Sequence, residues 1–403
     1  MIKSWIPSFG IPSKETRYGD TQVFIDTKNN ICFIIDGACE SGTSRLISYL
    51  KNNGIKRVYL VISHAHYDHT YGIKRILEDS YFTVVGLYCY DPESLTGGLR
   101  NNTGSKEVQS DITSLYDIIS KAKAKKVPIT FLKHGDKVQV GDIKFNVYRE
   151  QPSVVANNDT EGWSYMNDGS LCFYFYELLY WTSGDGPESI YNLIKKLGIQ
   201  VKFFKIPHHG NNCPQSQSKG LKSQGANLCW YNDLEPKGIG TNEFTAYGAR
   251  RCKEAGIMVL NCIGSDIEMS FANKKAIITK GTSTWSYDIP YGEKYDEGWV
   301  KDSIGWWYRF ADNSWAKGWQ KLKWSKGINE FYFNDRGYIM YGWQKLKKNE
   351  KWDWFYFDPN TGAMLTGWQK LKWSKGTDWF YFDKETGAML TGWQELSWSK
   401  GKD

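Results

Sequence analysis

The chain has 403 residues, 41% of them hydrophobic, which is enough for two or three domains with a sizeable core. It contains no run of 18 or more apolar residues, so the sequence excludes a membrane-spanning helix. The formal net charge of +7 suits a polyanionic partner such as teichoic acid or nucleic acid, and it equally suits a soluble surface that binds neither.

The first residues, "MIKSWIPSFGIPSKET", contain neither the apolar segment nor the small-residue cleavage site of a secretory signal peptide. The sequence therefore predicts a protein without a signal peptide. If the protein acts at the cell wall or outside the cell, we expect release by lysis or a phage-encoded origin.

Strand-like and helix-like runs alternate through residues 1–282. The runs "RVYLVIS" and "VKFFKIP" are typical of buried strands, whereas "DITSLYDIISKAKAKK" and "ESIYNLIKKLG" are typical of amphipathic helices. This alternation predicts a single α/β domain built from layers of helices and sheets.

The motif "SHAHYDHTYG" gathers three of the six histidines into one short segment. It follows the strand "RVYLVI", and the carboxyl end of a strand is where α/β sheets place ligands. His64 and His66 lie on the same side of an extended turn, while Asp68 and His69 enter the next helix. We expect the first pair to bind one metal ion and the second pair to bind another.

Two later segments complete a predicted dinuclear site. Asp185 in "SGDG" follows an apolar strand, and its carboxylate can bridge two cations. "IPHHG" adds His208 and His209; we favour His208 as the metal ligand and His209 as a group that contacts substrate or takes part in catalysis. Asp36, at the end of "FIID", is expected to orient the metal-bearing loop by hydrogen bonds.

In their order along the chain, these residues resemble the metallo-β-lactamase superfamily over residues ~20–280. The resemblance implies an αββα sandwich with two Zn²⁺ ions at one edge, with Mn²⁺ or iron as alternatives. Many members carry one more histidine before the bridging aspartate, where this chain has only His134, in a segment typical of a surface hairpin. Asn167 and Ser170, in "NDGSL", instead resemble a branch that includes DNA-uptake hydrolases and phosphorylcholine esterases, and we expect both to support the site.

Two cations close together activate a shared water near neutral pH and neutralise charge that builds up on a phosphoryl group. Phosphodiester hydrolysis is therefore the favoured reaction, with Asp68, Asp185 and His209 as the candidate catalytic residues. Opening of lactams or lactones and hydrolysis of thioesters use the same metal core, so the fold alone does not decide the reaction.

The composition changes near residue 290, because 14 of the 19 tryptophans lie between Trp299 and Trp398. Similar segments begin at Gly318, Gly342, Gly367 and Gly392, at steps of 24, 25 and 25 residues. Fixed periods of this length predict a solenoid, here of β-hairpins that bury their aromatic faces against one another. The predicted boundaries are 1–282 for the catalytic domain, 283–297 for a linker and 298–403 for the repeats.

The repeats resemble choline-binding modules, which implies that aromatic cages between hairpins hold a quaternary ammonium by cation–π attraction. A related module binds α-glucan, and aromatic residues that only form the core of the solenoid are a third interpretation. Glu330 takes the place of Trp354 and Trp379, so the cage departs from the pattern there. The expected choline-binding residues are Trp319, Trp343, Trp354, Trp368, Trp379, Trp393, Met340, Met364 and Met389.

A dinuclear hydrolase followed by such repeats resembles the teichoic-acid phosphorylcholine esterases. The resemblance implies a wall-associated enzyme that removes phosphocholine from teichoic acid or another wall polymer. Two alternatives remain open: a nuclease-type phosphodiesterase, and a wall-binding protein without activity. A nuclease would need a basic groove, to which the net charge of +2 outside residues 298–403 gives little support.

Overall fold

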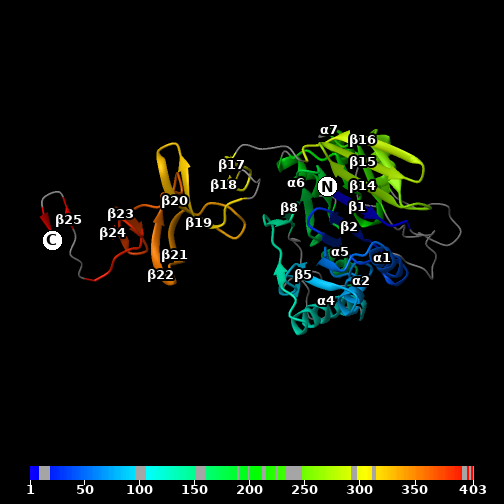
Figure 1. Cartoon of the computed structure of the whole chain (residues 1–403), viewed down its shortest axis with the longest axis horizontal. Coiled ribbons are helices and arrows are strands. Elements are labelled where there is room, and N and C mark those ends of the chain that lie inside the picture. Colours follow the sequence, from blue (N-terminus) through cyan, green and yellow to red (C-terminus); the bar gives the residue numbers. More distant parts are fainter. Residues whose placement is uncertain are drawn as a thin grey trace. The chain divides into compact units, whose positions relative to one another are not determined.

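The computed structural model describes residues 1–8, 19–96, 106–150, 159–187, 190–197, 199–210, 215–223, 225–231, 247–291, 297–310, 315–392, 397–398 and 401–402. The chain divides into two compact units, Met1–Glu293 and Lys294–Asp403. Both units are drawn in Figure 1, and each is described separately below.

The first sheet of unit Met1–Glu293 has nine strands. Its strands β3 to β6 run parallel, and the pairs from β16 through to β3 are antiparallel. In spatial order the strands are β16 (Ser283–Asp288), β15 (Lys275–Lys280), β14 (Ile267–Ala272), β1 (Ile2–Ile6), β2 (Gln22–Asp26), β3 (Ile31–Ile35), β4 (Arg57–Val61), β5 (Thr83–Cys89) and β6 (Ile129–Phe131).

The second sheet has seven strands. Strands β10 to β13 are parallel, as expected for strands joined through helices, and the pairs from β7 to β10 are antiparallel. In spatial order the strands are β13 (Met258–Asn261), β12 (Leu228–Tyr231), β11 (Phe203–Lys205), β10 (Tyr180–Thr182), β9 (Cys172–Phe175), β8 (Ile143–Tyr148) and β7 (Lys137–Val140).

Helices pack on the outer faces of both sheets. Leu46, Ile73 and Ile118 join the buried cluster of the first sheet, and helix residues such as Ile194 and Leu221 join that of the second. The helices of the first set are α1 (Glu40–Asn52), α2 (Tyr67–Glu78) and α4 (Lys106–Ala124); those of the second are α6 (Ile190–Leu197), α7 (Gln215–Ser223) and α8 (Tyr247–Glu254); α3 (Glu93–Thr96) and α5 (Asp159–Asp168) are short connections.

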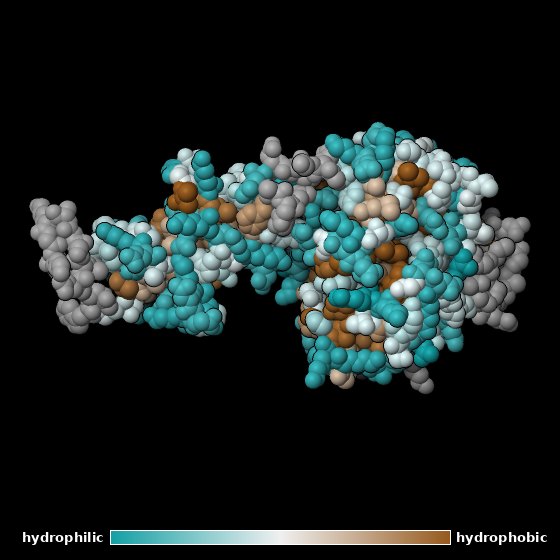
Figure 2. All heavy atoms as spheres, viewed as in Figure 1, coloured by the Kyte–Doolittle hydropathy of each residue, from teal (hydrophilic) through white to brown (hydrophobic). Residues whose placement is uncertain are grey.

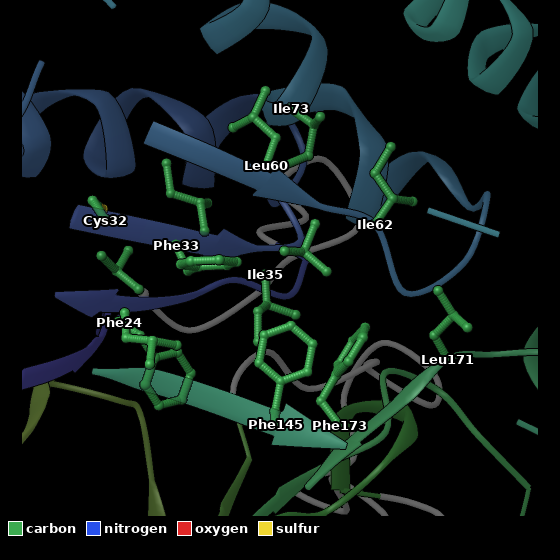
Figure 3. Close-up of a cluster of buried hydrophobic side chains, with 14 of the residues drawn as sticks. Phe24, Cys32, Phe33, Ile35, Leu60, Ile62, Ile73, Phe145, Leu171 and Phe173 are labelled. Atoms are coloured by element: carbon green, nitrogen blue, oxygen red, sulfur yellow. The ribbon is translucent and has the colours of Figure 1, made fainter. Parts of the chain in front are cut away.

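The core between the two sheets is rich in phenylalanine. Figure 3 shows Phe24, Phe33 and Ile35 of the first sheet facing Phe145 and Phe173 of the second. Phe24 stacks on Phe175 with ring centroids 4.4 Å apart, and Phe33 meets Phe145 edge-on at 5.9 Å. Both inner faces are therefore largely apolar, and the predicted αββα sandwich is confirmed.

The predicted linker was wrong over its first half. Residues 283–288 form β16, which pairs antiparallel with β15 along six residues. The alternation in "STWSYD" is that of an edge strand with one face on the core, where Trp285 and Tyr287 pack. The division between the two units falls at Glu293 and Lys294.

Unit Lys294–Asp403 consists of two-stranded antiparallel hairpins, as predicted for the repeats. In Figure 2 the surface is largely hydrophilic, with apolar residues in separate patches. Within the described residues, no helix is long and apolar enough to cross a bilayer. The hairpin strands are β17 (Gly298–Lys301), β18 (Trp306–Arg309), β19 (Gly318–Trp324), β20 (Gly327–Phe333), β21 (Gly342–Lys348), β22 (Lys351–Phe357), β23 (Gly367–Trp373), β24 (Gly376–Phe382), β25 (Ser397–Trp398) and β26 (Gly401–Lys402).

Candidate metal centre

The loop after β4 carries the first histidine motif and is held by one buried carboxylate. Asp36, directly after β3, accepts hydrogen bonds from the Ser63 backbone N–H at 2.8 Å and the Ser63 hydroxyl at 2.7 Å. It also lies 2.9 Å from Nδ1 of His69. A carboxylate on Nδ1 fixes the tautomer and leaves Nε2 to face the cluster. Asp36 thus joins the ends of the Ser63–His69 segment, and its role in orienting metal ligands stays a prediction.

His64 and His66 form one half of the cluster. Nε2 of His64 lies 3.0 Å from Nδ1 of His66 and 4.0 Å from Oδ2 of Asp185. The Ser63 hydroxyl lies 3.0 Å from the other ring nitrogen of His64. Gly184 has a φ of +52°, and a Cβ there would lie 2.4 Å from that hydroxyl, so the Asp185 loop reaches the histidines only because residue 184 has no side chain.

Asp68, His69 and His209 form the other half, again with Asp185. Nε2 of His69 lies 3.4 Å from Oδ1 of Asp185 and 3.9 Å from Oδ2 of Asp68. Nε2 of His209 lies 3.0 Å from Oδ2 of Asp68 and 3.6 Å from Oδ2 of Asp185. Donors bound tetrahedrally to one ion at ~2.1 Å lie ~3.4 Å from one another, so these spacings suit a cation between them.

The structure brings His209 into the cluster rather than the favoured His208. Both residues have left-handed backbones, with φ of +50° for His208 and +51° for His209, followed by Gly210 at +93°. This turn sends the buried His209 inward and leaves His208 half-buried, with its ring centroid 6.0 Å from that of His209. Strained backbone of this kind persists where the surroundings hold a side chain in a required direction.

The sequence reading missed two buried residues, Asp20 and Lys205. Oδ1 of Asp20 lies 3.8 Å from Nδ1 of His209, and its carboxylate is in contact with the Lys205 ammonium. Lys205 also donates to the Gly184 carbonyl at 2.9 Å and lies 3.9 Å from Asp185. Asp20 could itself supply a ligand atom; it lies on the Nδ1 side of His209 but makes no hydrogen bond to that ring.

The carboxylates give the cluster a strong preference for positive charge. Burial lowers the pKa of His69 and His209, yet nearby carboxylates, Asp185 foremost, outweigh burial, raise the pKa of His69 and bring that of His209 to about 10. Burial likewise raises the pKa of Asp185, but the two histidines reverse the effect and hold it well below its usual range. A site that draws protons onto histidines at neutral pH is one that attracts cations.

The donor set fits divalent metal ions. Among the residues that the structure describes, His69 Nε2 and Asp185 Oδ1 are buried and lie 3.4 Å from each other without forming a hydrogen bond. Buried polar atoms without hydrogen bonds are costly, and a coordinated cation would satisfy both. Imidazole nitrogens with carboxylate oxygens are ligands typical of zinc. Two overlapping groups, both containing Asp185, could each hold an ion.

Asn167, Ser170 and His134 were also considered from the sequence, and the structure places them differently relative to the cluster. The segment of Asn167 and Ser170 abuts the metal loop, since the backbone N–H of Leu171 donates to the Ser63 carbonyl at 2.9 Å. His134 is exposed in the part of the chain the structure describes and lies 3.1 Å from the Arg149 carbonyl, away from the cluster. Among the aromatic residues of the same unit, Tyr231 is half-buried, and Trp181 and Trp230 are core residues.

In the repeats, Trp319 and Trp343, which follow the leading glycines of their units, pack against the next hairpin. The ring of Trp319 lies 4.7 Å from that of Phe355, and the ring of Trp343 lies 4.8 Å from that of Phe380. The predicted aromatic residues that the structure leaves accessible are Trp354, Trp368 and Trp379, with exposed fractions of 42%, 54% and 57%. Trp393 lies outside the described residues.

The structure does not place Met340 at the position that Met364 and Met389 occupy in their hairpins. Met364 and Met389 bridge to Phe357 and Phe382, and the residue that bridges to Phe333 in the same way is Ile339. The Met340 N–H instead bonds to the Tyr332 carbonyl, one position along. Ile339 therefore takes the place of Met364 and Met389 at the junction between hairpins.

Comparison with known proteins identifies both parts of the chain. The family model described as the metallo-beta-lactamase superfamily matches residues 19–149, and that of the choline-binding repeat matches residues 353–393. No curated protein matches the chain significantly. The chain thus combines a metallo-β-lactamase-type domain with choline-binding repeats.

Solved structures resemble separate parts of the chain. Choline binding protein F from Streptococcus pneumoniae is 26% identical over 33% of this chain and 43% of its own, with a TM-score of 0.22. The metallo-beta-lactamase fold protein YhfI from Bacillus subtilis is 11% identical over 71% of this chain and 99% of its own, with a TM-score of 0.39. A metallo-beta-lactamase from Staphylococcus aureus is 16% identical over 52% and 49%, with a TM-score of 0.25.

The family matches and the His/Asp cluster together give the chain a lactamase-type segment with candidate metal ligands and a segment of choline-binding repeats. The lactamase-family match ends at residue 149, so Asp185 and His209 are assigned to the cluster by the geometry above.

Proposed function

We propose that the chain is a dinuclear phosphodiesterase that removes phosphocholine from a cell-wall polymer. The observation that carries the proposal is the position of Asp185, whose carboxylate faces His64 on one side and both His69 and His209 on the other. A carboxylate shared by two cation sites is the arrangement that two-metal phosphodiesterases use.

The proposed ligands divide into two sets that share Asp185. The chemistry that divalent cations supply when bound is activation of water near neutral pH and stabilisation of negative charge on phosphoryl oxygens. Zinc suits the donor set best, with manganese or iron as alternatives. One set is His64, His66 and Asp185, and the other is Asp68, His69, His209 and Asp185.

Asp68 is the proposed point of contact with the attacking water. Its side chain is 27% exposed, whereas the side chains of Asp185 and His209 are 3% and 5% exposed. Solvent and substrate therefore reach the cluster from the side of Asp68. A carboxylate at this position can orient a water molecule and accept its proton, while Asp36 keeps the His69 imidazole in place.

The repeats support a choline-bearing substrate over other phosphodiesters. A module that holds a quaternary ammonium on the polymer would bring neighbouring phosphocholine esters to the hydrolase domain at high effective concentration. A nuclease would gain nothing from this arrangement. The proposal therefore joins the chemistry of the metal site to the polymer that the repeats bind.

The test is turnover of p-nitrophenylphosphorylcholine and of bis-p-nitrophenyl phosphate by the zinc-loaded full chain. The Asp185→Ala variant should lose activity on both because it removes the shared carboxylate. Asp79→Ala is the matched control, since Asp79 pairs with Lys51 outside the cluster and its loss should leave turnover unchanged.

Preference for the choline ester, lost in Asp185→Ala and kept in Asp79→Ala, would support the proposal. Turnover of the generic diester alone would favour a nuclease or another wall phosphodiesterase. Absence of turnover with either substrate, in protein shown to contain metal, would refute phosphodiester hydrolysis.

A further inference from the structure

The junctions between successive hairpins repeat the same contacts, so their residues can be matched one to one. The indole N–H groups of Trp299, Trp319 and Trp343 donate to backbone carbonyls of the next hairpin at 2.9, 3.0 and 3.0 Å. The acceptors are the residues just before Trp324, Lys348 and Trp373, which are therefore equivalent.

A second set of equivalent positions follows from the strand register. Trp306, Glu330 and Trp354 each pair with a lysine on the partner strand of their hairpin. Their carbonyls accept hydrogen bonds from Ile339, Met364 and Met389, at 3.0, 2.9 and 2.8 Å. We call the three sites the first, second and third junction, named after Trp299, Trp319 and Trp343.

The first and third junctions are lined by tryptophans. In the first, Trp299, Trp306 and Trp324 surround a cavity of about 270 Å³, with Phe331 and Ile339. In the third, the equivalents of Trp306 and Trp324 are Trp354 and Trp373, which are 42% and 37% exposed. Exposed indole faces around an opening of this size are suited to a quaternary ammonium.

The second junction has a charged pair where the other two have tryptophans. Lys348 replaces the equivalent of Trp324, and Glu330 replaces that of Trp306. The Lys348 ammonium lies 4.6 Å from the centroid of Trp319 and 5.9 Å from that of Phe355. It also donates to Glu330 at 2.7 Å and to the Thr386 carbonyl at 2.8 Å.

This ammonium is held where a ligand cation would bind. Trp319 and Phe355 present their faces to it, and the Lys348 side chain is only 16% exposed. Cation–π attraction acts within about 6 Å of a ring centroid and strengthens as water is excluded. Two hydrogen bonds, one to a carboxylate, fix the ammonium in position. A second cation at the same place would meet Lys348 as a like charge.

We propose that Lys348 is the built-in ligand of the second junction, so that this cage never takes a quaternary ammonium from the wall polymer. The first and third junctions bind the polymer, and a site that the protein fills itself separates them. This inference rests on the proposed recognition of choline. It adds that bound choline groups are spaced two repeats apart on this part of the array, and that the middle hairpins are joined without ligand.

The experiment is calorimetric titration of the full chain with choline chloride. The number of choline molecules bound per chain is compared between the wild type and its variants. Trp306→Ala and Trp354→Ala should each bind one choline fewer than the wild type. The double variant Glu330→Trp with Lys348→Trp restores the tryptophan pattern and should bind one more. Lys347→Ala is the matched control, because this neighbouring lysine is 46% exposed and pairs with the exposed Glu350. This variant should bind as many choline molecules as the wild type.

A second measurement does not depend on the double variant folding. In ¹³C-lysine-labelled protein, the Lys348 side-chain methylene signals, assigned by their absence from Lys348→Ala, should be shifted upfield by the Trp319 ring. Saturating choline should leave them in place. An unshifted Lys348 signal, displacement of that signal by choline, or a folded double variant without the extra site would each overturn the inference. If the wild type binds no choline while the Lys348 shift is present, choline recognition fails and the filled cage stands.

Discussion

Asp36 provides a sharp test of how the metal loop is organised. Its Oδ1 accepts the Ser63 backbone N–H at 2.8 Å, and its Oδ2 faces both the Ser63 hydroxyl and His69 Nδ1. In Asp36→Asn the remaining oxygen can serve only one of these sides. If that oxygen faces the Ser63 hydroxyl and the His69 imidazole, the new amide NH₂ group faces the Ser63 backbone N–H. Two hydrogen-bond donors then oppose each other at a position that is 3% exposed.

The expected loss follows from that geometry. One buried hydrogen bond to a charged group is removed and one donor is left unsatisfied, which costs about 2–3 kcal/mol of unfolding free energy. Because His69 loses the carboxylate that fixes its orientation, zinc affinity should also fall by about 10- to 100-fold. The two quantities are measured by urea unfolding of the metal-free protein and by zinc competition with a chromophoric chelator.

Asp26→Asn is the matched control for this experiment. Asp26 is also a fully buried aspartate that accepts several hydrogen bonds, from Lys28, Asn29 and Asp142, but it lies at the far end of β2 from Asp20. It should lose comparable stability with unchanged zinc affinity. Equal zinc affinities in the two variants would refute the idea that Asp36 acts through His69.

Three further predictions concern individual groups. His209→Ala should lower the number of bound zinc ions by one, measured by atomic emission, whereas His208→Ala should keep both, because only His209 faces Asp68 and Asp185. Lys205→Met should lower the unfolding free energy by about 3–5 kcal/mol in denaturant, since Asp20 would stay buried without its cation; a neutral result would mean that Asp20 becomes protonated at no cost. Burial raises the pKa of Asp26, but the hydrogen bonds it accepts outweigh burial and hold the pKa below 3.8. Its stabilisation is present above that unfolded value and is lost as the pH falls through the lowered value, so Asp26→Asn should show a flatter stability profile below about pH 4; an unchanged profile would contradict this assignment.

Much of the metal centre could be predicted because its ligands are local to strand ends. Asp36, His64 and Asp185 each follow a buried strand closely, and neighbouring strand ends meet at one edge of the sandwich. The choice between His208 and His209 was not predictable, since it depends on left-handed backbone at both residues. An adjacent pair of histidines carries no pattern that tells which ring turns inward.

Asp20 and Lys205 were missed for a different reason. Each is a single charged residue beside an apolar run, and their pairing joins segments 185 residues apart. A lysine inside the buried strand β11, "FFK", is the one signal that the sequence offered, because a lysine that is almost fully buried needs a partner. The partner could be identified only once both sheets were in place.

The assignment of Met340 failed because the turns of the repeats differ in length. The turn "NDRG" in the first full unit is one residue shorter than "DPNTG" in the next, which accounts for the 24-residue step. Counting forward from the leading glycine places Met340 level with Met364 and Met389, whereas the bridge of Ile339 to Phe333 shows that Ile339 is their equivalent. The same register reveals that Lys348 occupies a tryptophan position, which composition alone does not show.

The charges of the metal centre bear on the class of substrate. Four aspartates, Asp20, Asp36, Asp68 and Asp185, surround the histidines, and Lys205 contributes one positive charge. With neutral imidazoles, the form in which histidines bind metal ions, these groups carry a net charge of about three negative units before any metal ion is counted. Two divalent ions would reverse this to about one positive unit, the charge that complements a phosphodiester monoanion. Phosphocholine also carries a quaternary ammonium, which must bind away from this centre. Under the proposed function, the phosphoryl group alone would enter the metal site, and the choline group would stay outside it.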